Sequence, residues 1–474
     1  MKKFINTITV YTLALFILAT SCKTIKPLEN NAIKNMPVSF SDVKDTANSA
    51  SIDWNLYFTD PNLIELIDMA LKNNLDLHIA LQKMEASKAY VRSSKGALFP
   101  SVNANVNYLG RRFGYYTMDD AGNRTTEIEP GKIIPTYLPD YYMGLQASWE
   151  IDLWGKLRNK KRAALARYLS SVEGKNLVTT NLIAEVANAY YELLALDNEL
   201  EIIRESIKIQ QSAFDLVSVQ KEAGVANELE VKQFEAQLNN SKALEYETLQ
   251  SITEVEAQIN YLLNRYPQTI KREKRDFSKP LSIVPNTDIP SDLLKNRPDL
   301  RQAEYDLMAS KADLKAAKAA FYPSLNITGM LGFQGYKAVL LPQSLAYTAA
   351  GGLIAPLLNR NAIKAEFKSA NAAQQEALFN YQKVILNGYM EVSNELAKVR
   401  NLEKIHEFKS YQVTALSQAI DVSSVLFKTG RANYIEVLLV QQNSLDSKIE
   451  LIGVKQRQYI ALVNIYKALG GGWK

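Results

Sequence analysis

The 474-residue sequence has a single cysteine, Cys22, and only two histidines, His78 and His406. This scarcity excludes a disulfide framework, a Cys-x-x-Cys redox centre and a metal site built from cysteine and histidine. The sequence also lacks a GxGxxG motif and a GxxxxGK phosphate loop. The two histidines fall in predicted helices of different halves, with no Ser/His/Asp arrangement in view. We therefore expect a protein that is not an enzyme and holds no cofactor and no metal.

Long uncharged apolar helices are missing beyond the N-terminus. The chain is 47% hydrophobic and 22% charged, which excludes a polytopic helical membrane protein. Two later uncharged stretches, 319–336 and 338–359, are interrupted as helices by Pro323, Pro342 and Pro356. The net charge of +5 falls to +3 without Lys2 and Lys3, which is too small to predict a nucleic-acid partner.

The N-terminus has the features of an export signal. Lys2 and Lys3 precede an apolar stretch from about Ile8 to Ala19, and small residues lead to Cys22. This pattern predicts a signal peptide over residues 1–21, because the apolar stretch is too short for a transmembrane anchor. The segment resembles a bacterial lipoprotein signal, which implies that Cys22 is acylated, for example by palmitate, and becomes the mature N-terminus. The departure from that pattern is Ala19, with Leu18 one position early.

The sequence contains an internal duplication. LKNNLDL at 71–77 matches LKNRPDL at 294–300, and FPS at 99–101 matches YPS at 322–324 at the same offset. Further on, GVANELEV at 224–231 aligns with GRANYIEV at 430–437. Ordered Pro, Gly and Asn matches are hard to obtain by chance, so both halves should share one structural plan.

Each half begins with a helical segment, about 61–98 and 291–320, which ends before a proline. The pattern then changes to strict alternation, with apolar residues at 102, 104, 106 and 108 separated by Asn103, Asn105 and Asn107. Residues 325–332 and 142–151 alternate in the same way, and 344–355 do so more weakly. Such strands fit a transmembrane β-barrel, but also a half-buried sheet of a soluble protein.

Very long helices are expected after each strand pair. The runs 155–221 and 358–427 turn at Gly224 and Gly430 and return over 228–264 and 433–468. Nearly seventy residues at ~1.5 Å per residue reach about 100 Å, which no compact domain needs. The return helices carry coiled-coil spacing, which we interpret as helix–helix packing.

The number of predicted strands requires an oligomer if they cross a membrane. Each chain supplies four strands, and open strand edges cannot lie in lipid because their N–H and C=O groups have no partner there. Single-chain barrels start at about eight strands. Two chains would give eight strands and three would give twelve, and both numbers satisfy the requirement for a closed barrel.

Several ordered motifs resemble the outer membrane efflux protein family of TolC type, and specifically its NodT-like lipoprotein branch. They are NRPDLRQAE at 296–304, WEIDLWGKLR at 149–158, FYPSL at 321–325 and YKALGGGW at 466–473. The resemblance covers essentially the whole mature chain. It implies a mixed α and β membrane protein, in which a trimeric 12-stranded transmembrane β-barrel is continuous with a long periplasmic α-helical barrel.

The resemblance also implies a function and a location. The homotrimer would lie in the outer membrane of a Gram-negative bacterium, anchored in outer membrane lipid. Its tunnel would meet a periplasmic adaptor (membrane fusion) protein and, through it, an inner-membrane pump of the resistance-nodulation-division (RND) type. Drugs, metals or other small molecules would pass through passively. A type I secretion channel is the alternative, and a periplasmic coiled-coil adaptor or structural protein is a further one.

In such proteins the hairpin tips form the closed periplasmic entrance and contact the adaptor. The matching residues are Gly224, Val225, Ala226, Asn227, Gly430, Arg431, Ala432 and Asn433. The alternative is turn chemistry without a partner. The positions that match the family's constriction are Ile435, Leu439 and Gln442. Family members often have an Asp and an Arg there, and this sequence departs from that pattern. We therefore expect a gate closed by apolar contact of Leu439, and the alternative is that Leu439 is ordinary helix–helix core.

These observations divide the chain into five parts. Residues 1–21 are the signal peptide, 22–60 the lipid-anchored segment, 61–266 the first repeat, 267–290 a proline-rich linker and 291–474 the second repeat. Residues 109–139 and 336–343 fall between paired strands, so we expect them to be loops outside the cell.

Overall fold

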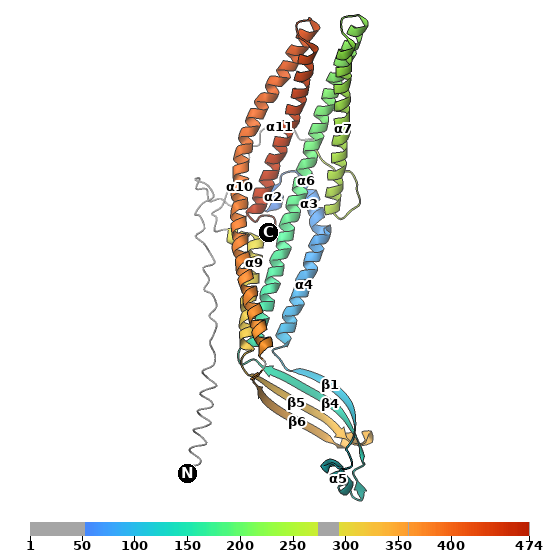
Figure 1. Ribbon diagram of the computed structural model, residues 1–474, viewed down its shortest axis with the longest axis vertical. Helices are drawn as coiled ribbons and strands as arrows, with labels where there is room; N and C mark the ends of the chain where they lie inside the picture. The colour runs from blue at the N-terminus through green and yellow to red at the C-terminus, as the bar shows by residue number, and fades with distance from the viewer. Residues whose placement is uncertain (1–52, 274–292, 359, 474) are drawn as a thin grey trace, which may run out of the picture. The chain divides into compact units, whose positions relative to one another are not determined.

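The computed structural model describes residues 53–273, 293–358 and 360–473 (Figure 1). The predicted signal peptide, Cys22, most of the segment 22–60 and most of the linker lie outside these ranges.

The same order of elements occurs twice along the described chain. The first half contains α2 (Trp54–Tyr57), α3 (Pro61–Asn73), α4 (Leu75–Gly96), β1 (Ser101–Arg112), α5 (Met118–Thr125), β2 (Glu127–Glu129), β3 (Lys132–Ile133), β4 (Tyr137–Ile151), α6 (Lys156–Glu222) and α7 (Glu228–Leu262). The second contains α8 (Leu293–Asn296), α9 (Pro298–Ala319), β5 (Ser324–Gly335), η3 (Ala338–Gln343), β6 (Leu345–Ile354), α10 (Asn361–Lys428) and α11 (Tyr434–Ala468). Two helices, two strands of the main sheet and a long helical hairpin therefore recur.

The long helices have the expected length. Helix α6 contains 67 residues and α10 contains 68, so each extends for about 100 Å at ~1.5 Å per residue. Helix α6 packs against α4 and α9 along one part of its length and against α7 and α11 along another (Figure 1). Helix α10 packs against α9 and α11. The two hairpins of one chain therefore meet mainly through α6 and α11.

The first helical segment is broken at Asn74, which the sequence pattern did not predict. The Asn74 side-chain oxygen accepts a hydrogen bond from the Leu77 N–H at 3.0 Å and so caps α4. Its side-chain nitrogen donates to the Leu262 carbonyl at 3.0 Å. The corresponding break in the second half precedes Pro298, which occupies the first turn of α9.

The largest buried cluster joins α3, α6, the end of α7 and the middle of α11; we call it the central core. Leu63, Ile67, Tyr190, Leu194 and Ile259 lie in it and are almost completely buried. The coiled-coil stripe of α11 reaches it through Ile452, Tyr459 and Val463.

The main sheet is antiparallel, in the order β1-β4-β5-β6. Its register places like residues side by side across all four strands: Val106 lies opposite Met143, Met143 opposite Phe333 and Phe333 opposite Leu345. On the other face, Asn103 lies opposite Gln146 and Gln146 opposite Met330. One face is thus continuously apolar, and the other is rich in amides and small residues.

The segment between β1 and β4 is more ordered than the expected loop. Helix α5 is capped by Thr117, and Gly131, with φ of +74°, turns the small β2-β3 hairpin. Arg124 pairs with Asp120 at 2.9 Å, and its guanidinium carbon lies 3.9 Å from the centre of the Tyr115 ring. Local capping and ion pairing, which sequence periodicity does not detect, account for this difference.

Among the described residues, no helix combines the length and apolarity needed to cross a bilayer.

Candidate functional site

The two hairpin tips are built by the same backbone chemistry. Gly224 and Gly430 have φ of +75° and +69°, a left-handed conformation that side chains disfavour. The following N–H groups, of Val225 and Arg431, each donate at 2.8 Å to the carbonyl five residues earlier, which closes the helix end. Asn227 and Asn433 then cap the returning helices through their side-chain oxygens.

This chemistry separates six of the eight predicted tip residues into two groups, and the other two, Ala226 and Ala432, are half-buried. The two Gly and the two Asn are explained by the turn itself. Val225 is 76% exposed and Arg431 is also exposed, and neither side chain contributes to the turn. If the tips contact a partner, these two residues are therefore the ones available for it.

Just inside the tips, a small apolar cluster joins the two hairpins. Val217, Val231 and Phe234 of the first hairpin are buried, and Phe427, Tyr434 and Leu438 of the second pack against them. The rings of Phe234 and Phe427 have centroids 6.4 Å apart. We call this group the tip cluster.

The predicted gate residues lie on one uncovered face of α11. Ile435 and Leu439 are 45% and 53% exposed, and Gln442 is exposed as well. Their spacing of four and three residues places all three on one side of the helix. Within one chain, Leu439 is therefore not part of the helix–helix core, which Val437 and Leu445 occupy on other faces.

The same face continues with carboxylates. Asp446 follows Gln442 by four residues, and Glu450 follows Asp446 by four. Partial burial and the nearby charge of Glu450 raise the pKa of Asp446. This pair was not predicted from the sequence, although the four-residue spacing continues directly from Gln442.

The apolar face of the sheet is bounded by aromatic residues at both ends. At one end the rings of Tyr108 and Tyr141 have centroids 5.0 Å apart. At the other, the Trp149 indole N–H donates to the Leu98 carbonyl at 3.0 Å, and Trp154 stacks on Tyr322 at 4.9 Å. Amphipathic rings at both limits of an apolar band are typical of a membrane-spanning sheet.

Both edges of the sheet, β1 and β6, lack a neighbouring strand within the described part of the chain. Helix α10 is similarly incomplete on one side. Its exposed apolar residues recur along much of its length: Phe379, Leu386, Met390, Phe408, Tyr411, Val422 and Val425. Unpaired strand edges and a long apolar stripe both require a further partner.

The passage from β4 into α6 is fixed by Asp152. Its carboxylate accepts hydrogen bonds from the N–H groups of Leu157 at 3.1 Å and Arg158 at 2.8 Å. Burial favours a higher pKa for Asp152, but these bonds and the Arg158 guanidinium outweigh it, so its pKa lies below the usual range. Gly155, with φ of +77°, provides the sharp turn.

Arg297 ties the second repeat together. Its guanidinium forms a bidentate pair with Asp299, contacts Glu391 at 2.8 Å and donates to the Ala468 carbonyl at 2.7 Å. Gly388 packs against it, and a Cβ there would meet Arg297 Nε at 3.4 Å, an ordinary van der Waals contact. The start of α9, the middle of α10 and the end of α11 are thus joined at one buried side chain.

In the ranges that the structure covers, no group of three or more His, Cys, Asp or Glu side chains is arranged to hold a metal ion.

Comparison with known proteins gives a consistent result. Residues 66–265 and 289–471 match the family model described as "Outer membrane efflux protein". The chain is 27% identical to a protein described as probable outer membrane lipoprotein SilC of Salmonella typhimurium, over 97% of both chains. It is 30% identical to the toluene efflux pump outer membrane protein TtgC of Pseudomonas putida, over 90% of this chain and 86% of that protein.

A solved structure supports the same fold. The Campylobacter jejuni CmeC outer membrane channel superposes with a TM-score of 0.83 at 23% identity, covering 94% of each chain.

Proposed function

Because this chain belongs to the outer membrane efflux protein family, we propose that three copies assemble into one outer membrane channel. Their strands close a 12-stranded β-barrel in the membrane, and their long helices continue it as a tunnel into the periplasm. The protein passively conducts drugs, metals or other small molecules outward.

The observation that carries this proposal is the pair of open sheet edges. A four-stranded sheet in lipid would leave the outward N–H and C=O groups of β1 and β6 unsatisfied. Pairing β6 of one copy with β1 of the next removes every edge when the ring closes. The apolar stripe of α10 would be covered by the same head-to-tail arrangement.

The helical faces support this arrangement. The uncovered face of α7 offers small and amide side chains, such as Ala236, Asn240 and Ala243, whereas α10 offers Phe408, Tyr411 and Val422. Large side chains of one helix can pack into the spaces between small ones of another. Edge pairing fits a ring of two or three copies, and the resemblance to TolC-type proteins favours three.

The apolar face has a suitable height for a bilayer. Tyr141 and Trp149 are eight residues apart on β4, or roughly 27 Å along the strand at ~3.4 Å per residue. A strand tilt of about 40° reduces this to about 20 Å, close to the ~25 Å apolar band of outer membrane barrels.

The partners follow from the location of the tips. We propose that Val225 and Arg431, with the surrounding tip residues, contact a periplasmic adaptor protein that links the channel to an inner-membrane RND pump. Ile435, Leu439 and Gln442 would face the tunnel and narrow it near the tip. Acylation of Cys22 would add a lipid anchor, which the described residues do not include.

Reconstitution tests this proposal. Protein extracted in detergent should be cross-linked to a three-chain species, lose that species on heating, and give discrete currents in planar bilayers. A monomer that is soluble without detergent and silent in bilayers would contradict it. Cys22→Ala should still assemble, because strand pairing and not the acyl chain holds the barrel together.

A further inference from the structure

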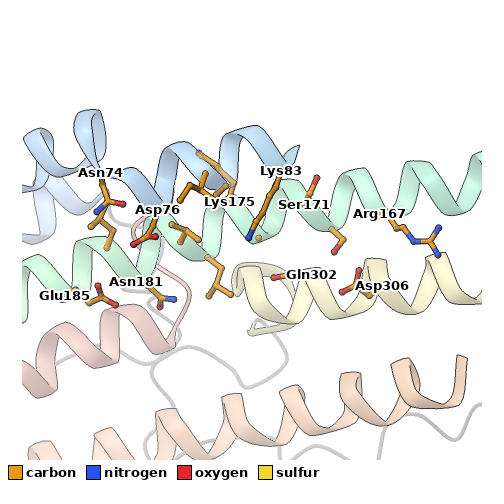
Figure 2. Close-up of a pocket in the computed structure, with 17 residues that line it drawn as sticks. Asn74, Asp76, Lys83, Arg167, Ser171, Lys175, Asn181, Glu185, Gln302 and Asp306 are labelled. Atoms are coloured by element: carbon orange, nitrogen blue, oxygen red, sulfur yellow. The ribbon is translucent and has the colours of Figure 1, made fainter. Parts of the chain in front are cut away.

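A pocket of about 660 Å³ lies between α4, α6 and α9 (Figure 2). Its lining includes three carboxylates and three basic groups, contributed by all three helices: Asp76, Lys83, Arg167, Lys175, Glu185 and Asp306. Neutral polar groups such as Asn181 and Gln302 lie between them.

Most of these charges are unpaired in the part of the chain that the structure describes. Arg167 forms an ion pair with Asp313. The side chains of Asp76, Lys83, Lys175, Glu185 and Asp306 make no ion pair or hydrogen bond with the described residues. Figure 2 shows the labelled side chains arranged along the space between the helices. The pocket is therefore open to a ligand that carries charges of its own.

The pocket lies on the face of α6 opposite the central core. Ile183 and Tyr190 belong to that core, and Tyr190 donates to Asp60 at 2.9 Å. At ~100° per residue, Asn181 points about 200° away from Ile183. The segments α2 and α3 and the C-terminal segment lie on the core side of α6, and they would fill the tunnel if that side were inside it. The core side must therefore be external, and the pocket on the opposite side must open into the tunnel.

We propose that this pocket is a transient binding site in the tunnel wall for amphoteric small molecules, which carry both an ammonium and a carboxylate group. This inference rests on the proposed channel function. Lys83 and Lys175, in the middle of the pocket, would receive the carboxylate. The ammonium group would lie at either side of them, against Asp76 and Glu185 at one end or Asp306 at the other. A zwitterion can pair with the carboxylates and with the basic groups at the same time. A simple anion is repelled by the carboxylates, and a simple cation is repelled by the basic groups.

The volume and polarity suit brief retention. The pocket is within the ~300–1,000 Å³ range of small-molecule sites, but its lining is far more polar than in tight sites. Screened ion pairs give modest affinity, so a bound molecule can leave again. Conduction requires this combination of favourable entry and easy release.

Single-channel recording of the full-length protein in planar bilayers tests the site with two matched probes. Ampicillin carries an ammonium and a carboxylate, and benzylpenicillin carries the carboxylate alone. Ampicillin should interrupt the current for longer than benzylpenicillin. The double variant Glu185→Gln/Asp306→Asn should shorten the ampicillin events about two- to fivefold, the range that one or two screened ion pairs provide. The same variant should not shorten the current interruptions caused by benzylpenicillin.

The matched control is Glu245→Gln. Glu245 pairs with Arg204 at 2.7 Å, and Arg204 lies two heptads from Tyr190 on the external face of α6. This variant should keep the full difference between the probes. The binding site would be refuted if ampicillin and benzylpenicillin interrupted the current for equal times, or if their difference persisted in Glu185→Gln/Asp306→Asn. The proposed channel function would be unaffected by either result. Absence of any current would refute the channel and the site together.

Discussion

The central core and the main sheet differ in how far one chain completes them. In the core, Leu63, Ile67 and Tyr190 are almost fully buried against other residues of the same chain. In the sheet, Val106 and Tyr347 are 79% and 78% exposed, and both edges are open. The helical core can therefore form in a single chain, whereas the sheet depends on lipid and on further copies.

The energetic consequence is large. Burying one large apolar side chain is worth about 1.5–3 kcal/mol. In the core this free energy comes from intramolecular packing, but on the sheet and along α10 it becomes available only on membrane insertion and assembly. The same division predicts which substitutions damage folding and which damage assembly.

The most severe substitution should be Arg297→Ala on the core side of this comparison. It leaves Asp299 and Glu391 without their buried cation, which costs about 3–5 kcal/mol. The measurement is the free energy of unfolding in urea, followed by tryptophan fluorescence. The exposed Arg400→Ala should change it by less than about 0.5 kcal/mol, and equal losses in both variants would contradict the assigned network.

On the sheet, adjacent residues of β4 should behave differently. Leu145 lies on the apolar face and Gln146 on the other, so Leu145→Arg places a charge in lipid at a cost of about 2–4 kcal/mol. Gln146→Arg places it on the polar face. The fraction of heat-sensitive oligomer folded into vesicles should fall sharply only for Leu145→Arg. Similar yields from both variants would mean that the sheet does not have one lipid-facing side.

The sequence predicted the regular elements because their signals are local. Alternation identified β1, β4, β5 and the weaker β6, and the Gly-x-Ala-Asn motifs located both hairpin turns. It did not reveal the break at Asn74, whose side chain is held by the Leu262 carbonyl, a contact across 188 residues. Nor did it reveal the fold of 113–136, which the Thr117 cap and the contacts of Arg124 with Asp120 and Tyr115 stabilise.

The candidate site was predicted only in part for a similar reason. The positions of Ile435, Leu439 and Gln442 came from the family resemblance, and their exposure could not be read from a stripe that resembles coiled-coil core. The unpaired charges of the α4-α6-α9 pocket depend on which helices become neighbours. Periodicity within one helix gives its faces, but not the helix that each face meets.

A third prediction concerns the tips. Leu439→Asp should raise single-channel conductance severalfold, because three carboxylates in a narrow ring repel one another and loosen the apolar closure. The control is Leu229→Asp, at the position of the first hairpin that corresponds to Ile435; Leu229 is also exposed, at 58%. It should have a smaller effect if the second hairpin alone forms the constriction. Unchanged currents in Leu439→Asp would refute the gate assignment.

The smallest effect should come from Asp446, farther from the tip on the same face of α11. Its raised pKa means that it takes up a proton at a higher pH than an ordinary aspartate. We expect the Asp446 carboxylates of the assembled copies to make the tunnel prefer cations, and this preference should begin to fall above the usual aspartate range as the pH is lowered. The reversal potential in a KCl gradient measures this. Glu450→Gln removes the like charge and should move the transition to lower pH, and Asp446→Asn should abolish it. The raised pKa also means that ionised Asp446 is disfavoured in the folded state. Asp446→Asn should therefore slightly raise the free energy of unfolding at neutral pH. It should have no effect below the pKa that Asp446 has in the unfolded chain. A transition that Glu450→Gln leaves in place would show that other carboxylates control the selectivity.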